Sequence, residues 1–180
     1  MKIWRLNLAV NDYESFWSPE KISISEQRTF DGRSKIDNWK TIKAAKIHPN
    51  ETRPIPNAAD FYTLIPAFDS TALETLGNLM KGAIEILPIE FEDTIWNGIY
   101  VTKILDAINH EKAKPVRLSS GKIIRFEKYA FLLDVVQGHH IFRISDKRLS
   151  FVFVSDEFKK CAETAELTGF NFECVWDSEI

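Results

Sequence analysis

The sequence has few of the residues and runs on which several classes of protein depend. Two cysteines among 180 residues are too few for a disulfide framework. No apolar run reaches the roughly 20 residues that a membrane-spanning helix needs. The seven glycines are scattered, and neither of the common glycine-rich phosphate-binding motifs occurs. We therefore expect no disulfides, no membrane partner and no phosphate loop.

Spacings typical of metal and catalytic sites are missing as well. The motifs CxxC and HExxH do not occur, and His139 and His140 are adjacent. In a strand their rings would point to opposite faces, so they could not easily bind one metal together. Cys161 and Cys174 both fit apolar periodicity, and we interpret them as small buried hydrophobic residues. We predict no catalytic residues, no cofactor and no metal.

The composition is that of an ordinary globular protein, with 44% hydrophobic and 27% charged residues. The first residues, MKIWRLNLAVNDYE, have no small-residue cleavage pattern after their apolar stretch. We expect a cytoplasmic protein. Its net charge of −3 is unevenly distributed, because residues 61–110 and 156–180 each hold two basic and seven acidic side chains. Such acidic blocks are either solvated faces or a surface for a basic partner.

Proline divides the chain. Lys2–Ala9 reads as a strand, and the mixed pattern between Ser34 and His48 allows either a strand or a short helix. Three prolines between residues 49 and 57 exclude regular structure there. We therefore predict an N-terminal lobe or extension over residues 1–59 and a main domain over residues 60–180.

The pattern of the last third of the chain predicts two strands, then a capped helix, and then a further strand. A β-branched and aromatic run over residues 149–154 stops at Ser155, a good helix N-cap. An apolar stripe then recurs at helical spacing from Phe158. Gly169 suits the end of that helix, and alternation from Phe170 to Cys174 predicts a strand with one buried face.

An earlier segment repeats this order. Phe61–Ile65 reads as a strand, Asp69 or Ser70 caps a helix, and Ile84–Ile89 returns as a strand. Aligning Ser70 with Ser155 places Leu73 on Phe158. The likeness is either a pseudo-repeat or two examples of a common strand–helix–strand pattern, and we favour the second.

Between these two units the pattern predicts mostly strands. A strand at Gly98–Val101 is followed by a short helix through Ile104 and Ile108 and by a basic link over residues 110–120. Further strands are predicted at residues 122–126, 129–135 and 141–144. The fold class that accounts for these elements is α+β, a mixed β-sheet with two or three packed helices and a strand-containing N-terminal extension.

Two charged stretches are candidate binding surfaces. The basic residues between Lys112 and Lys128 are diluted by acids, and the protein is acidic overall. We therefore interpret this stretch as a solvated face and expect no nucleic-acid partner. The acidic stretch after Glu85 ends in carboxylates beside an aromatic residue, which suits a protein interface with a charged rim and an anchor. We predict binding of a protein partner by Glu90, Glu92, Asp93 and Trp96.

Several segments between Asp60 and Trp176 resemble immunity protein family eleven, the bacterial polymorphic-toxin immunity proteins. The segments that carry the resemblance are Ile65-Pro66, Glu85-Ile-Leu-Pro88, Tyr100-Val-Thr-Lys-Ile-Leu-Asp106, Ile141-Phe-Arg143, Val152–Lys159 and Leu167–Phe172. One position departs from the family pattern, where Ala113 stands in place of the usual Ser.

The resemblance implies a non-enzymatic inhibitor that binds and neutralises a cognate toxin in interbacterial competition. An acidic patch would suit a toxin with a basic active site. Two alternatives belong to other classes. One is a metal-dependent or hydrolytic enzyme that uses the carboxylates between Glu85 and Asp93, and the other is an adaptor or self-associating module.

Overall fold

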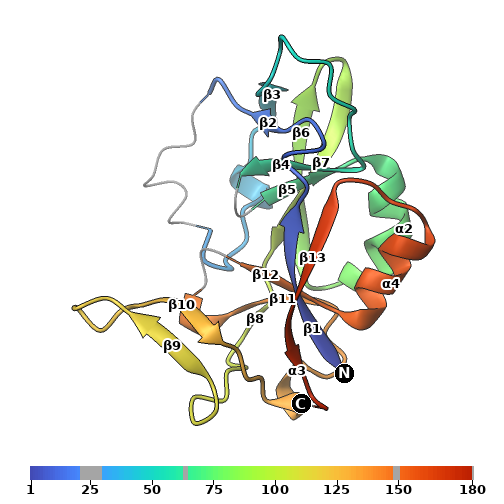
Figure 1. The fold of residues 1–180 in the computed structure, drawn as a ribbon. Helices are drawn as coiled ribbons and strands as arrows, with labels where there is room; N and C mark the ends of the chain where they lie inside the picture. Colours follow the sequence, from blue (N-terminus) through green and yellow to red (C-terminus); the bar gives the residue numbers. More distant parts are fainter. Residues whose placement is uncertain (21–29, 63–64, 148–150, 180) are drawn as a thin grey trace.

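The computed structural model describes residues 1–20, 30–62, 65–147 and 151–179, which form two β-sheets, a separate hairpin and helices packed on the sheets (Figure 1). The six-stranded sheet has the order β2-β3-β6-β7-β5-β4 and the five-stranded sheet the order β13-β1-β12-β11-β8. Each contains one parallel pair, β3 with β6 and β8 with β11, so both sheets are mixed. These features confirm the predicted α+β class.

The elements of the six-stranded sheet and its helix are β2 (Phe16–Trp17), β3 (Ile42–Lys46), β4 (Ala58–Tyr62), β5 (Ile65–Phe68), α2 (Ser70–Met80), β6 (Ile84–Phe91) and β7 (Thr94–Val101). Those of the five-stranded sheet and its helices are β1 (Lys2–Leu8), β8 (Ile104–Leu105), α3 (Leu133–Val136), β11 (Ile141–Ile144), β12 (Val152–Ser155), α4 (Asp156–Thr164) and β13 (Phe170–Asp177). The separate hairpin is β9 (Lys114–Arg117) with β10 (Ile123–Lys128), and the 3₁₀ turns are η1 (Ile36–Asn38) and η2 (Ser145–Lys147).

Both strand–helix–strand units have the same topology. Strands β5 and β6 both pair antiparallel with β7, so they run parallel to each other with β7 between them. Strands β12 and β13 are related in the same way through β1. In each unit, therefore, a helix connects two parallel strands across an antiparallel strand that comes from elsewhere in the chain.

The helix caps form where the sequence predicts them. The Asp69 carboxylate accepts from the Ala72 N–H at 2.8 Å, and the Ser155 hydroxyl accepts from the Phe158 N–H at 3.2 Å. Each bond satisfies one of the backbone donors that a helix N-terminus leaves free. The caps thus fix where α2 and α4 begin.

Helices α2 and α4 lie side by side over the two sheets (Figure 1). Buried side chains from both helices and both sheets form one core cluster there, which includes Leu76, Met80, Ile99, Val154 and Phe158. Other clusters cover the opposite faces, one under the five-stranded sheet around Phe142 and Phe153 and one under the six-stranded sheet around Phe16 and Trp96. Each sheet is therefore buried on both faces over part of its area.

Several predicted elements are confirmed and four are wrong. The strands at residues 2–9, 84–89, 98–101 and 141–144 are present, and residues 34–48 contain both a 3₁₀ turn and a strand. The helix predicted through Ile104 and Ile108 is instead strand β8 and a loop. The strand predicted at residues 129–135 is instead an isolated bridge at Phe131 followed by α3. The basic link predicted at residues 110–120 contains strand β9, and the strand predicted at residues 61–65 is divided between β4 and β5, which pair antiparallel. Residues 63–64 and 149–150, which belong to two predicted strands, lie outside the described residues.

The N-terminal residues are part of the five-stranded sheet. Strand β1 lies between β12 and β13 and pairs with both. The division between residues 1–59 and 60–180 stays a prediction, and we propose that residues 1–59 are an extension of the main domain rather than a separate lobe. Within the described part of the chain, no helix is both long and apolar enough to cross a membrane.

Candidate functional site

The acidic residues predicted to bind a partner lie at the tip of the β6–β7 hairpin. Phe91 pairs with Thr94, so Glu92 and Asp93 form the two-residue turn. Glu92 adopts a positive φ of 49°, and its carbonyl accepts from the Thr94 N–H at 3.0 Å. Both turn residues are exposed, and the tip therefore presents their carboxylates to solvent.

Trp96 does not join these carboxylates as an exposed anchor. It pairs across the hairpin with Ile89, whereas Glu90 pairs with Ile95 on the other face of the sheet. The indole is 6% exposed and packs edge-on against Phe16 at 4.9 Å between ring centroids. The most exposed apolar side chain described in the hairpin is Ile95, which is 59% exposed.

Lysines of β3 compensate part of the acidic charge. Lys46 lies 3.1 Å from Glu92, and Lys43 lies 4.0 Å from Glu90. Both pairs are largely exposed, so each carries little energy, but each reduces the negative potential of the tip. Binding of a partner by Glu90, Glu92, Asp93 and Trp96 stays a prediction.

The carboxylates of the alternative enzyme site do not converge. Alternation along β6 directs Glu85 and Glu90 to opposite faces, and Glu85 accepts from the Lys35 N–H at 2.7 Å. His48 lies beside the buried carboxylate of Glu14 at 3.4 Å, far along the chain from this strand. No group of three or more His, Cys, Asp or Glu side chains that could hold a metal occurs among the residues that the structure places.

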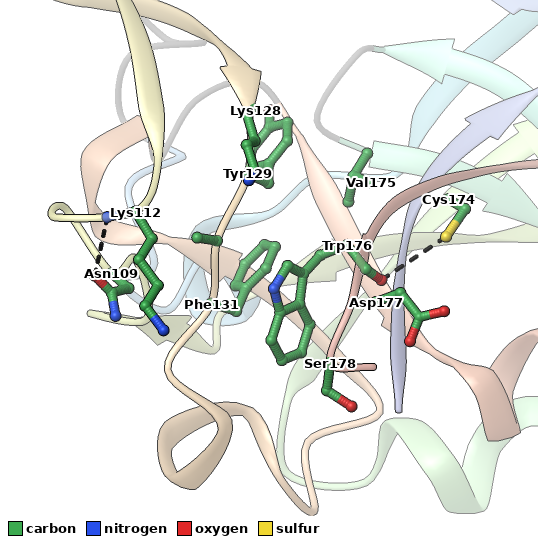
Figure 2. A pocket seen from close by; sticks show the side chains of 11 residues that line it. Asn109, Lys112, Lys128, Tyr129, Phe131, Cys174, Val175, Trp176, Asp177 and Ser178 are labelled. Atoms are coloured by element: carbon green, nitrogen blue, oxygen red, sulfur yellow. Dashed lines mark hydrogen bonds between the residues drawn. The ribbon is translucent and has the colours of Figure 1, made fainter. Parts of the chain in front are cut away.

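A second surface lies at the C-terminal end of β13, where a hollow of about 480 Å³ opens to solvent (Figure 2). Three segments form it: the loop before β9, the chain that leaves β10, and β13 with the residue after it. The residues that line the hollow are Asn109, Lys112, Lys128, Tyr129, Ala130, Phe131, Cys174, Val175, Trp176, Asp177 and Ser178.

Aromatic rings form the floor of this hollow. Tyr129 and Phe131 are parallel with centroids 5.8 Å apart, and Trp176 meets Phe131 at 5.8 Å and an angle of 63°. Burial raises the pKa of the Tyr129 phenol. Lys112 and Lys128 are exposed at the rim, and in Figure 2 Lys112 lies across the rings from Asp177. The hollow thus combines an apolar floor with positive charge.

Strand β13 is an edge strand with an irregularity near its end. The register against β1 shifts between Ile3 and Trp4, which inserts Val175 between the paired residues Cys174 and Trp176. The buried face therefore changes along the strand. Cys161 packs against the core as expected, but Cys174 is exposed, so the prediction that both cysteines are buried is wrong for Cys174.

Sequence reasoning missed this hollow because its three walls are distant along the chain. The basic residues from Lys112 to Lys128 were visible as a charged stretch, but nothing local connects them with Trp176. One signal could have indicated the irregularity, since two successive apolar residues, Val175 and Trp176, break the alternation of the strand.

The fold and these surfaces define an α+β protein with an acidic hairpin tip and an aromatic hollow beside an open sheet edge. Residues 98–177 match the Immunity protein family (Imm11), which confirms the resemblance predicted from the sequence over that segment. No curated protein matches the chain.

The matched segment contains one candidate surface and not the other. It begins at Gly98 in β7 and ends at Asp177, the last residue of β13. Every residue that lines the hollow except Ser178 therefore lies within it, whereas the hairpin tip at residues 90–96 lies outside.

Proposed function

We propose that this chain is a non-enzymatic immunity protein that binds and neutralises a cognate toxin, the C-terminal domain of a secreted polymorphic toxin. The match of residues 98–177 to the immunity family is the observation that carries this proposal. The protein would act in the cytoplasm of the producing cell and its kin. A scaffold of two sheets held by one helix pair suits the task, because it leaves loops and edges free to vary.

Co-expression tests the proposal. The toxin domain encoded by the neighbouring open reading frame should stop growth when expressed alone and be tolerated when this chain is expressed with it. The two purified proteins should form a stable complex by calorimetry. If the chain neither protects cells nor binds that domain, the proposed function is wrong.

The acidic hairpin tip is the first contact that we propose. Reversing Glu90, Glu92 and Asp93 to Lys should weaken toxin binding at least about tenfold if the tip faces a basic surface. A matched control reverses three other exposed acids, Asp12, Asp37 and Glu74, so that the control and the test variant have the same net charge. Trp96 is left unchanged, because truncating a buried ring would unfold the sheet locally.

A further inference from the structure

We propose that the open edge of β13 and the hollow beside it bind an extended segment of the toxin by strand addition. An apolar side chain of that segment would enter the hollow, and a carboxylate of the same segment would face Lys112 and Lys128. This inference rests on the proposed function and names the surface and the partner chemistry that would carry it out. It combines main-chain pairing for affinity with a side-chain pocket for specificity.

Among the residues that the structure describes, none pairs with the backbone groups along the outer edge of β13. The Ala9 N–H bonds to the Gly169 carbonyl at 2.9 Å, so residues 9 and 169 are a hydrogen-bonded pair. Because such pairs alternate in an antiparallel ladder, the N–H and C=O groups of Phe170, Phe172 and Cys174 are directed away from β1. A segment that pairs with β13 would find donors and acceptors at the spacing of a strand.

This edge is also longer than the others. Among the strands that the structure describes, the edge strands β2 and β8 have two residues each and β4 has five, whereas β13 has eight. Edge strands are usually protected by outward charges. The acidic side chains Glu173 and Asp177 of β13 do not provide this protection. They are paired with Arg5 and Lys2 of β1, the strand on the other side of β13 from the open edge.

The hollow adjoins the open edge and not a face of the sheet. Five consecutive residues from Cys174 to Ser178 line it, although successive side chains of a strand point to opposite faces. No residue of β1 lines it. Because the hollow is lined by side chains from both faces of β13 but by none from β1, it lies along the free edge of β13. An added strand would run along that edge.

The chemistry of the hollow indicates what its occupant carries. Trp176 and Phe131 can stack on an aromatic or cover an aliphatic side chain. Within the described chain, neither Lys112 nor Lys128 forms an ion pair, whereas the neighbouring Lys114 is held by Glu127 at 2.8 Å. The two free ammonium groups would attract a carboxylate, so we expect an acidic and apolar segment.

Hydrogen exchange can test the edge directly. The probe is the toxin domain encoded by the neighbouring open reading frame, added to the full chain. We expect it to slow exchange at the outward amides of Phe170, Phe172 and Cys174 at least about tenfold, and to leave Asn171 and Glu173 nearly unchanged because these already face β1. Alkylation of the exposed Cys174 thiol should slow in parallel.

Two variants separate strand addition from a general effect on the strand. Cys174→Pro removes an outward N–H, a change that edge strands tolerate, and Cys174→Ala removes only the thiol. We expect the proline variant to bind the toxin domain at least about tenfold more weakly than the alanine variant, which shares the loss of the thiol but keeps the N–H. Lys112→Glu with Lys128→Glu, which leaves the backbone unchanged, should weaken binding at least as much.

The outcomes distinguish this inference from the proposed function. Protection of the outward amides, with loss of binding in the proline and glutamate variants, supports it. If the parent binds the toxin domain but all these variants bind equally well, strand addition is wrong and the proposed function stands. A parent chain that dimerises through β13 without the toxin domain would also overturn it, because the edge would then serve a second copy.

Discussion

At the scale of single residues, the fully buried Arg143 connects the two sheets through hydrogen bonds. It lies in β11, and its guanidinium donates to the carbonyls of Phe30 and Val101, the latter in β7 of the other sheet. The same group lies 5.2 Å from the ring centroid of Tyr100. Burial lowers the pKa of Arg143, but an arginine remains charged at neutral pH. A buried charge of this kind must keep its partners to be tolerated.

Replacing Arg143 should therefore be costly. We expect Arg143→Ala to lower the free energy of unfolding by about 3 kcal/mol or more, because it opens a cavity and leaves buried carbonyls unpaired. Arg143→Lys should recover little, since an ammonium cannot reproduce the planar fork. Urea unfolding measures both. Tyr100→Phe is the milder variant, because it removes one hydroxyl, which accepts from the Gly32 N–H and also interacts with Arg143, and it should cost about 1 kcal/mol.

Asp60 should make stability depend on pH. Burial raises the pKa of its carboxyl above the ordinary value of 3.8. Between 3.8 and the raised pKa the folded state holds more protons than the unfolded state, so this group lowers stability as pH rises through that window. Asp60→Asn should therefore be more stable than the parent at pH 7, and the difference should disappear below pH 3.8. Denaturant unfolding from pH 3 to 8 gives the comparison, and an equal difference at every pH would contradict it.

At the scale of elements, the sequence predicted best what local chemistry decides. The caps at Asp69 and Ser155 depend on neighbouring residues only, and both form. What it missed depends on distant partners. Residues 104–105 become a strand because β11 pairs with them, and Tyr129 and Phe131 are buried side by side without belonging to a strand of their own.

The same distinction holds for the candidate surfaces. The acidic tip was visible because its residues are adjacent, but the burial of Trp96 depends on Phe16, which is distant along the chain. Gly169 was predicted to end the preceding helix. In the structure, the residue with a positive φ at the end of α4 is Glu166, with a φ of 54°. Gly169 instead lies against the carbonyl of Ala58 in the six-stranded sheet.

Gly169 should accordingly tolerate no side chain. It has a φ of +88°, and an added Cβ would lie 2.1 Å from the Ala58 oxygen. We expect Gly169→Ala to lower the free energy of unfolding by more than about 2 kcal/mol. Gly82→Ala is the matched control, because its φ of +73° is similar but nothing lies within 4 Å, so only the conformational cost of about 1 kcal/mol remains. Equal losses in the two variants would show that the contact with Ala58 is unimportant.

At the scale of the whole molecule, the two units share more than the sequence pattern suggested. In both, a hairpin precedes the helix, since β4 and β5 correspond to β11 and β12. The buried positions also coincide when the caps are aligned, with Ala72 on Phe158 and Leu76 on Ala162. Aligning Ser70 with Ser155 was therefore wrong by one residue, because Asp69 is the cap.

The units differ in where the inserted strand lies along the chain. In the first unit β7 follows β6 through a two-residue turn, whereas in the second the inserted strand is β1. The start of β1 lies beside the end of β13, since the Ser178 N–H bonds to the Met1 carbonyl at 2.9 Å and Lys2 pairs with Asp177. Moving residues 1–9 to follow β13 would give the second unit the chain order of the first.

This correspondence predicts the behaviour of two rearranged chains. Deleting residues 1–9 should abolish cooperative unfolding, because β12 and β13 both lose the strand between them together with the buried Ile3. Joining residues 1–9 behind residue 180 in the deleted chain should restore a single urea transition within about 2 kcal/mol of the parent, since it recreates the same pairs through a short connection. The same permuted chain carrying Ile3→Asp is the control and should remain unfolded. A deleted chain that unfolds cooperatively on its own would show instead that residues 10–180 form their core without β1.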